Sequence, residues 1–193
     1  MYQTLVIAHV VMIIATMVST IALARIRGSV EHKYLLLTCV CVDLYTIGYY
    51  VELTAENIDV AVTSLGFQYT GLGLASLCYS MFVFNYCKVK IVPPWVWRVL
   101  AGYFMIIIAL VVTCRHHTYY YSSIRWIEEG LFPHLNLGRS PMFWCFTVMQ
   151  TTLLVISSVV VWFRRKRSLK KNERKQLTFL FVETLIPVLG ILA

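Results

Sequence analysis

Charged residues are scarce in this sequence. Asp, Glu, Lys and Arg make up 13% of the chain, hydrophobic residues make up 59%, and the mean hydropathy is +0.72. Soluble domains usually carry about 25% charged residues, so this composition excludes an ordinary soluble protein. Several apolar runs reach the roughly 20 residues that cross a bilayer as a helix. The sequence therefore predicts an integral membrane protein.

The sequence also lacks the short motifs of common active sites. It has no GxSxG or HExxH motif and no paired carboxylates at motif spacing inside an apolar run. The glycines of GFQYTGLG lie within an apolar run rather than after a strand, so they are not a nucleotide-binding fingerprint. We expect no enzymatic activity from these residues.

The six cysteines and five histidines lack the spacing of structural metal sites. No CxxC motif is present, most cysteines fall within apolar runs, and no two histidines are four residues apart. We therefore expect buried, reduced thiols, no bound metal and no cofactor. Two alternatives stay open: a disulfide between Cys114 and Cys145, and haem or metal binding by outer histidines such as His116 and His117.

Six apolar segments divide the chain. The first lacks a basic N-terminal region, exceeds the core of a secretory signal in length and runs into Arg25 and Arg27, so we interpret it as an uncleaved helix. The pattern predicts an all-α membrane protein, a polytopic helix bundle that forms one domain over residues 1–193. The segments are 3–25, 34–53, 60–87, 94–114, 141–163 and 177–193.

Lys and Arg are nearly missing from every second loop. Three lie between residues 25 and 33, three between 88 and 98, and eight between 164 and 175, which makes 14 of the 17 basic residues. Because basic loops stay in the cytoplasm, we expect the N-terminus on the extracellular or periplasmic side. The net charge of +8 then indicates orientation and contact with anionic lipids rather than nucleic-acid binding.

The end of the chain does not fit a complete bundle. Six crossings would leave Ala193 outside, and the last apolar segment is only about as long as the shortest membrane helices. We therefore expect the domain to be truncated in or after its sixth helix, with a seventh helix beyond. A natural six-helix protein is the alternative.

Polar residues inside the apolar runs mark candidate sites, because they are expensive in lipid. Glu52 ends the second run, and Gln68 and Tyr69 lie two to three turns into the third. Glu183 precedes Pro187 by one turn, and a proline within a helix opens space beside it. The alternative for each residue is a purely structural role, as a hydrogen bond between helices or an ion pair at the membrane interface.

The order of these features resembles a known family. It is similar to the N-terminal seven-helix sensor region of bacterial histidine kinases and diguanylate cyclases, over about residues 34–193. The matching residues are Gly48-Tyr49-Tyr50-Val51-Glu52-Leu53, Gln68-Tyr69-Thr70-Gly71, His116 and His117 with Tyr119 and Tyr120, Gly138 to Trp144, Arg174 to Gln176, and Ile186-Pro187.

The resemblance implies the sensory input domain of a signalling receptor in the bacterial inner membrane. Such a domain senses an extracellular or membrane-borne cue and signals to a cytoplasmic kinase or cyclase, commonly as a homodimer. The sequence departs from the family pattern by ending in the sixth helix without an output domain.

We expect a pocket for an unknown small-molecule or membrane-borne ligand in the outer half of the bundle. The aromatic loop over residues 115–141 predicts a hairpin or lid above it. A small transporter or channel, with Glu183 on an ion path, is the rival function, although no inverted repeat is visible. The predicted ligand-binding residues are Glu52, Gln68, Tyr69, His116, His117, Trp144 and Glu183.

Overall fold

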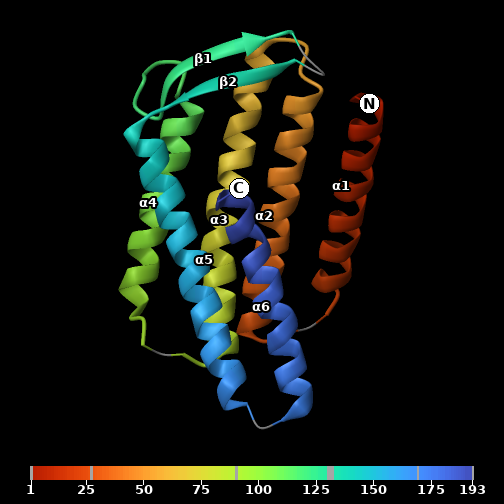
Figure 1. Ribbon diagram of the computed structural model, residues 1–193, viewed down its shortest axis with the longest axis vertical. Helices are drawn as coiled ribbons and strands as arrows, with labels where there is room; N and C mark the ends of the chain where they lie inside the picture. The colour runs from red at the N-terminus through yellow and green to blue at the C-terminus, as the bar shows by residue number, and fades with distance from the viewer. Residues whose placement is uncertain (1, 27, 90, 130–132, 169, 193) are drawn as a thin grey trace.

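The computed structural model describes residues 2–26, 28–89, 91–129, 133–168 and 170–192, and the side chains of its last helix through Leu185. The described residues form a bundle of six helices with a β-hairpin across one end (Figure 1). The elements in chain order are α1 (Tyr2–Ala24), α2 (Val30–Leu53), α3 (Ile58–Tyr86), α4 (Pro94–Val112), β1 (Tyr121–Ile127), β2 (His134–Arg139), α5 (Pro141–Arg167) and α6 (Lys171–Leu192).

The all-α membrane bundle predicted from the apolar segments is confirmed. Each segment corresponds to one helix, and α1, α2, α4 and α5 are long and apolar enough to cross a membrane. Three helix ends lie well beyond the predicted segments. α2 begins at Val30 rather than at residue 34, α5 continues to Arg167 rather than ending at 163, and α6 begins at Lys171 rather than at 177. Arg and Lys are good helix formers, so the basic residues extend all three helices beyond the apolar runs.

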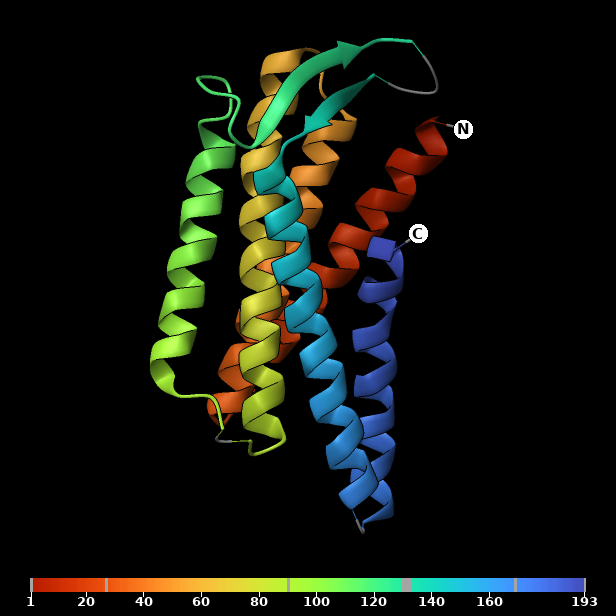
Figure 2. The same cartoon turned by 60° about the vertical axis from the view of Figure 1, so that its left-hand side comes forward.

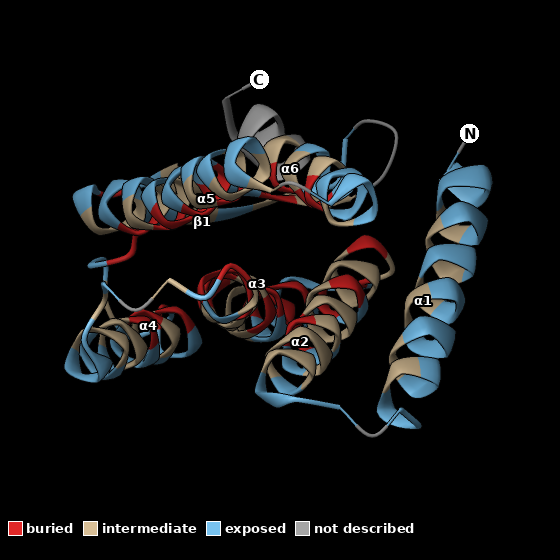
Figure 3. Cartoon of the chain, turned by 90° about the horizontal axis from the view of Figure 1, so that it is seen from below, coloured by how far each residue is buried: buried red, intermediate tan, exposed pale blue. Residues whose placement is uncertain are grey.

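Helix α3 lies at the centre of the bundle. It packs against α2, α4 and α5, and Figure 3 shows buried residues around much of its circumference. Its buried polar groups find partners within the protein: the hydroxyls of Ser64 and Ser80 donate to the carbonyls of Ala61 and Ser76. Because other helices rather than lipid surround α3, this helix tolerates polar residues that a lipid-facing helix would not.

Two glycines bring α2 and α3 close together. A Cβ atom at Gly48 would lie 2.8 Å from the backbone nitrogen of Gln68. A Cβ atom at Gly71 would lie 2.5 Å from both the carbonyl oxygen of Cys41 and the backbone nitrogen of Tyr45. Carbon atoms pack at about 3.5–4.0 Å, so a larger residue at either position would separate the helices. Small residues at such contacts are typical of membrane helix pairs.

Helix α1 diverges from the other helices toward its N-terminus (Figures 2 and 3). It packs against α2, where the Tyr2 hydroxyl donates to the carbonyl of Leu53 over 3.1 Å and the rings of His9 and Tyr49 lie 4.9 Å apart. None of its described residues is buried, and apolar side chains such as Ile7 are exposed. In a membrane these side chains are open to lipid or to another membrane helix.

The two ends of the bundle carry different groups. We call the end with β1, β2 and the α2–α3 turn the hairpin end, and the opposite end the basic end (Figures 1 and 2). The loops that follow α1, α3 and α5 all lie at the basic end. The three Lys- and Arg-rich stretches of the sequence are therefore on one side of the bundle, as their alternation predicted.

The β-hairpin forms where the aromatic loop predicted it. β1 and β2 are antiparallel, with Tyr121 paired to Arg139 and Ile127 paired to His134, and the register shifts between Tyr121 and Ser123. Such an irregularity bends a strand. The hairpin thereby crosses the end of the bundle rather than extending away from it (Figure 2).

Helix α3 ends in a Schellman motif that holds a lysine where glycine is usual. The N–H of Lys88 donates to the carbonyl of Asn85, and the N–H of Val89 donates to the carbonyl of Phe84. Lys88 has a φ of 56°, a left-handed conformation that costs a residue with a Cβ about 1–2 kcal/mol. Glycine would therefore be the more stable residue at this position.

Hydroxyl groups connect α3 to both α5 and α6 in the half of the bundle nearer the basic end. The Tyr79 hydroxyl lies 2.5 Å from Oγ1 of the buried Thr184, and the Ser157 hydroxyl donates to that of Ser80 over 3.1 Å. These bonds join side chains more than 70 residues apart in the sequence, so they fix how the last two helices pack on the central one.

Candidate functional site

A carboxylate and an amide meet where α2 and α3 reach the hairpin end. The Gln68 side chain donates from Nε2 to Oε2 of Glu52 over 2.6 Å, and its Nε2 lies 3.4 Å from the Ser64 hydroxyl. Gln68 is 8% exposed. Gly48 makes this contact close, because its missing side chain lets the Gln68 backbone approach α2. The structure thus brings together two of the predicted site residues.

His134 is part of the same region, and sequence reasoning missed it as a site residue. It is the first residue of β2, and it lies near enough to Glu52 for a favourable electrostatic interaction. The hairpin crosses the bundle end here, and β2 also packs against α3. The two residues are 82 positions apart in the sequence, and only the fold of the hairpin brings them together. The sequence therefore contains no pattern that predicts this contact.

Tyr69 points to a different side of α3, into an aromatic cluster. Its ring centroid lies 5.2 Å from that of Tyr120, 6.2 Å from that of Tyr121 and 5.4 Å from that of Phe146. Tyr120 and Tyr121 are 0% and 1% exposed. Edge-to-face aromatic pairs of this kind add about 0.5–1.5 kcal/mol beyond the area they bury. The cluster (Tyr69, Tyr120, Tyr121 and Phe146) joins α3, the start of the hairpin and α5.

The two hairpin tyrosines keep polar groups inside this cluster. Burial raises the pKa of the Tyr120 and Tyr121 hydroxyls, which therefore stay protonated. Among the described residues, neither hydroxyl has a hydrogen bond of regular geometry. Both hydroxyls interact with the hydroxyl of Tyr69, so the three tyrosines form one polar group inside the aromatic cluster.

Ser140 fixes the aromatic cluster to α5. It precedes Pro141 at the start of α5, and its hydroxyl donates to the carbonyls of Tyr119 and Tyr120 over 2.6 and 2.7 Å. Proline is favoured at the first position of a helix because its missing N–H would have no helical partner. The Ser-Pro pair thus begins α5 and holds the preceding loop against it.

A pocket of about 430 Å³ opens beside the aromatic cluster. Tyr121 lines it from the cluster side, and Arg115 and Asp59 lie in its wall. The Arg115 Nη1 atom lies 2.7 Å from Oδ1 of Asp59, and the same guanidinium also donates to the Asp59 carbonyl. We call this the hairpin-end pocket; its lining residues are Ile58, Asp59, Val62, Cys114, Arg115, His116, His117, Thr118, Tyr121, Ser122, Ser123 and Ile124.

His116 and His117 lie in this pocket rather than beside Glu52. The His117 ring nitrogen Nε2 is 2.9 Å from the Thr113 hydroxyl, and its ring stacks against Tyr119 at 5.1 Å between centroids. The side-chain exposures of Arg115 and Asp59 are 40% and 76%. The pocket thus presents two imidazoles and a solvated ion pair, a set suited to anionic or hydrogen-bonding ligands.

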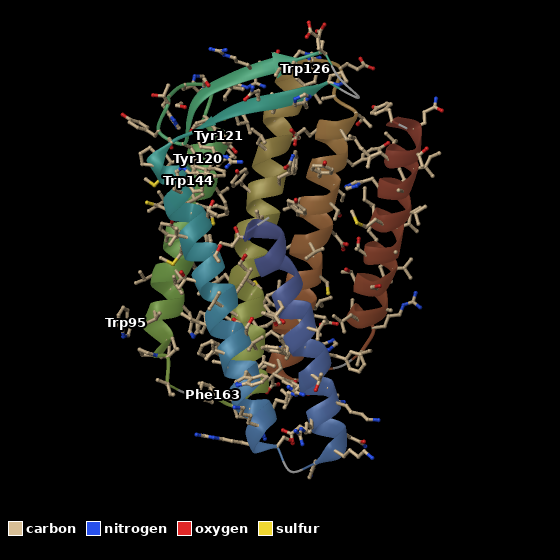
Figure 4. All side chains as sticks on the ribbon, in the orientation of Figure 1. Trp95, Tyr120, Tyr121, Trp126, Trp144 and Phe163 are labelled. Atoms are coloured by element: carbon tan, nitrogen blue, oxygen red, sulfur yellow. The ribbon has the colours of Figure 1, made fainter. Side chains whose placement is uncertain are left out.

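Two predicted site residues lie elsewhere. Trp144 is 50% exposed near the start of α5, and the Arg139 guanidinium lies 5.4 Å from its ring centroid (Figure 4). Glu183 is exposed and adjoins Thr184, which binds Tyr79. Tyr79 follows Gln68 by eleven residues, about 16 Å along α3 at 1.5 Å per residue. The side chain of Pro187, whose kink was expected to open space for Glu183, lies outside the described residues.

The described residues offer no evident metal centre. Within the part of the chain that the structure describes, no group of three or more His, Cys, Asp or Glu side chains is placed to hold a metal ion. All six cysteines are free thiols, with Cys114 buried and Cys145 exposed.

These features define a polytopic helical membrane protein with a polar and aromatic site at one end. A model of the N-terminal 7TM region of histidine kinase matches residues 4–193. The chain belongs to this family and is a membrane sensory input domain, as the sequence motifs indicated. Comparisons with curated proteins and with solved structures give no match.

Proposed function

We propose that this domain senses a small polar or membrane-borne ligand in the hairpin-end pocket, on the extracellular or periplasmic side of the bacterial inner membrane. The observation that carries the proposal is the position of Tyr121. It lines the pocket and also packs against Tyr69 of the central helix. A ligand that displaces or orders Tyr121 would therefore act directly on α3.

The pocket chemistry favours a ligand with an acidic or strongly accepting group. Arg115 already holds Asp59, and an incoming carboxylate or phosphate would compete for the same guanidinium. His116 and His117 add donors beside it. Glu52, Gln68 and His134 lie on the other side of α3, where they hold α2 and the hairpin in register with α3 and so set the resting state.

The signal would reach α6 through α3. The Tyr79–Thr184 and Ser80–Ser157 bonds connect α3 to the last two helices. Ligand binding would favour one packing of these helices over another, a population shift that biases a downstream domain. We propose that this downstream domain is a cytoplasmic histidine kinase, with diguanylate cyclase as the alternative, that the 193 residues themselves have no catalytic activity, and that the receptor acts as a homodimer.

Substitution of Arg115 tests the pocket. A library of small organic acids, phosphates and amino acids can be screened by thermal unfolding of the purified protein. We expect to find compounds that raise the Tm of the wild type. The concentration that gives the same rise in Tm for Arg115→Gln should be at least about tenfold higher, since a charge-assisted bond contributes about 1.5–3 kcal/mol.

Arg125→Gln is the matched control. Arg125 lies exposed in β1 outside the pocket lining, and its substitution removes the same charge from the same hairpin end. Its response should equal that of the wild type. Compounds that stabilise wild type and Arg115→Gln at the same concentrations would place the ligand elsewhere.

A further inference from the structure

A second pocket lies at the basic end, between the end of α3 and the end of α5. Its volume is about 520 Å³. It is separate from the hairpin-end pocket, because the two share no lining residue and lie at opposite ends of the bundle. The residues that line it are Cys87, Lys88, Val89, Ile91, Val160, Phe163, Arg164 and Arg167.

One part of this lining is apolar and exposed. Ile91 is 88% exposed and Phe163 is 57% exposed, and Figure 4 places Phe163 low on α5, toward the basic end. Exposed apolar side chains near the ends of membrane helices offer a surface on which an acyl chain can pack. Val89 and Val160 complete the apolar wall.

The other part of the lining is cationic. Lys88, Arg164 and Arg167 supply three positive charges, and Glu173 neutralises part of one through its 2.9 Å bond to Arg164. Glu31 of α2 lies within electrostatic reach of Lys88 without lining the pocket. The ends of α3 and α5 each add about half a negative charge. The eight Lys and Arg residues between 164 and 175 outweigh these contributions, so this region attracts anions.

The backbone conformation of Lys88 also indicates that positive charge is needed at this pocket. Lys88 takes the left-handed position of the α3 Schellman motif, where glycine would be more stable. A lysine at this position places its charge beside Arg164 and Arg167, which belong to a helix 76 residues further along the chain. The charge is thus present despite an unfavourable backbone conformation.

We propose that the basic-end pocket binds one anionic phospholipid, with its phosphate on Lys88, Arg164 and Arg167 and an acyl chain along Phe163 and Ile91. The pocket combines a cationic wall with an apolar wall at the end of the membrane helices, as a headgroup and its chain require. Arg164 can hold Glu173 and a phosphate together, because a guanidinium has five N–H donors.

Native mass spectrometry of the purified protein tests this site, with dioleoyl-phosphatidylglycerol as the probe and dioleoyl-phosphatidylcholine as the neutral reference. We expect one phosphatidylglycerol molecule to bind at least about tenfold more tightly than phosphatidylcholine. The double variant Lys88→Gly/Arg167→Gln should lose about tenfold or more of that affinity. Glycine relieves the left-handed conformation, so this variant should unfold at a temperature no lower than the wild type.

The double variant Lys170→Gln/Lys171→Gln is the matched control, because it removes the same charge from the same end of the bundle, outside the pocket lining. Its affinity for phosphatidylglycerol should change less than about twofold. An equal loss in both double variants would overturn the proposal in favour of diffuse attraction. Full competition by soluble glycerol 3-phosphate at equal concentration would overturn it in favour of a simple anion site.

Discussion

Gly71→Ala should lower the free energy of unfolding by about 2 kcal/mol. The new Cβ would lie 2.5 Å from backbone atoms of Cys41 and Tyr45, so α2 and α3 would have to separate by about 1 Å to restore normal contact. Backbone atoms cannot rotate away as a side chain can. Overpacking costs about 1–3 kcal/mol, which exceeds the gain of up to about 1 kcal/mol that alanine brings to a helix.

Gly102→Ala in α4 supplies the control for this measurement. A Cβ at Gly102 would have no neighbouring atom within 4 Å, so this variant should be as stable as the wild type or more stable by up to about 1 kcal/mol. Chemical unfolding of both variants in the same detergent gives the comparison. Equal stabilities for Gly71→Ala and Gly102→Ala would contradict the close packing of α2 on α3.

Gln68→Leu should destabilise the protein by about 1–3 kcal/mol, the second large effect that we expect. The substitution removes the amide that donates to Glu52 over 2.6 Å and leaves that carboxylate without this donor between two helices. A polar group that loses its partner costs more than a hydrogen bond contributes on average. Thermal unfolding of the purified variant measures this loss.

The double variant Glu52→Leu/Gln68→Leu separates this explanation from simple loss of packing. Replacing both partners with apolar groups of similar size can be nearly neutral, so the double variant should be more stable than Gln68→Leu alone. Strictly additive losses from Glu52→Leu and Gln68→Leu would show that the two side chains do not stabilise each other.

The helix bundle could be predicted from the sequence because a small number of physical rules determines where membrane helices form. Apolar length marked each helix, and the uneven distribution of Lys and Arg marked one end. The hairpin followed from the aromatic and β-favouring residues of the loop over residues 115–141. The start of α2, the end of α5 and the start of α6 were misplaced, since charged side chains extend helices beyond the apolar region.

Which residues form the site was harder to predict from the sequence. Gln68 and Glu52 could be assigned to one site, because a short turn joins their helices, but their hydrogen bond was not predicted. The pocket beside Tyr121 depends on how the hairpin crosses the bundle end, and the Arg115–Asp59 pair depends on α4 ending beside the start of α3. Contacts between residues 56 positions apart leave no local pattern in a single sequence. The position of Glu183 near Tyr79 likewise follows from the packing of α6.

The most direct test of the proposed signal transfer from the hairpin end to α6 is an autophosphorylation assay of the proposed full-length histidine kinase. The assay is run with and without a compound that acts through Arg115. Tyr79→Phe removes the hydroxyl that binds Thr184. Tyr103→Phe removes a buried hydroxyl of α4 with no hydrogen-bond partner among the described residues.

Both variants should keep the rise in Tm that the compound produces. Tyr79→Phe should reduce the change in kinase activity about fivefold, because about 1 kcal/mol of coupling is lost, and Tyr103→Phe should leave it unchanged. Equal kinase responses in wild type, Tyr79→Phe and Tyr103→Phe would contradict transfer through α3 to α6.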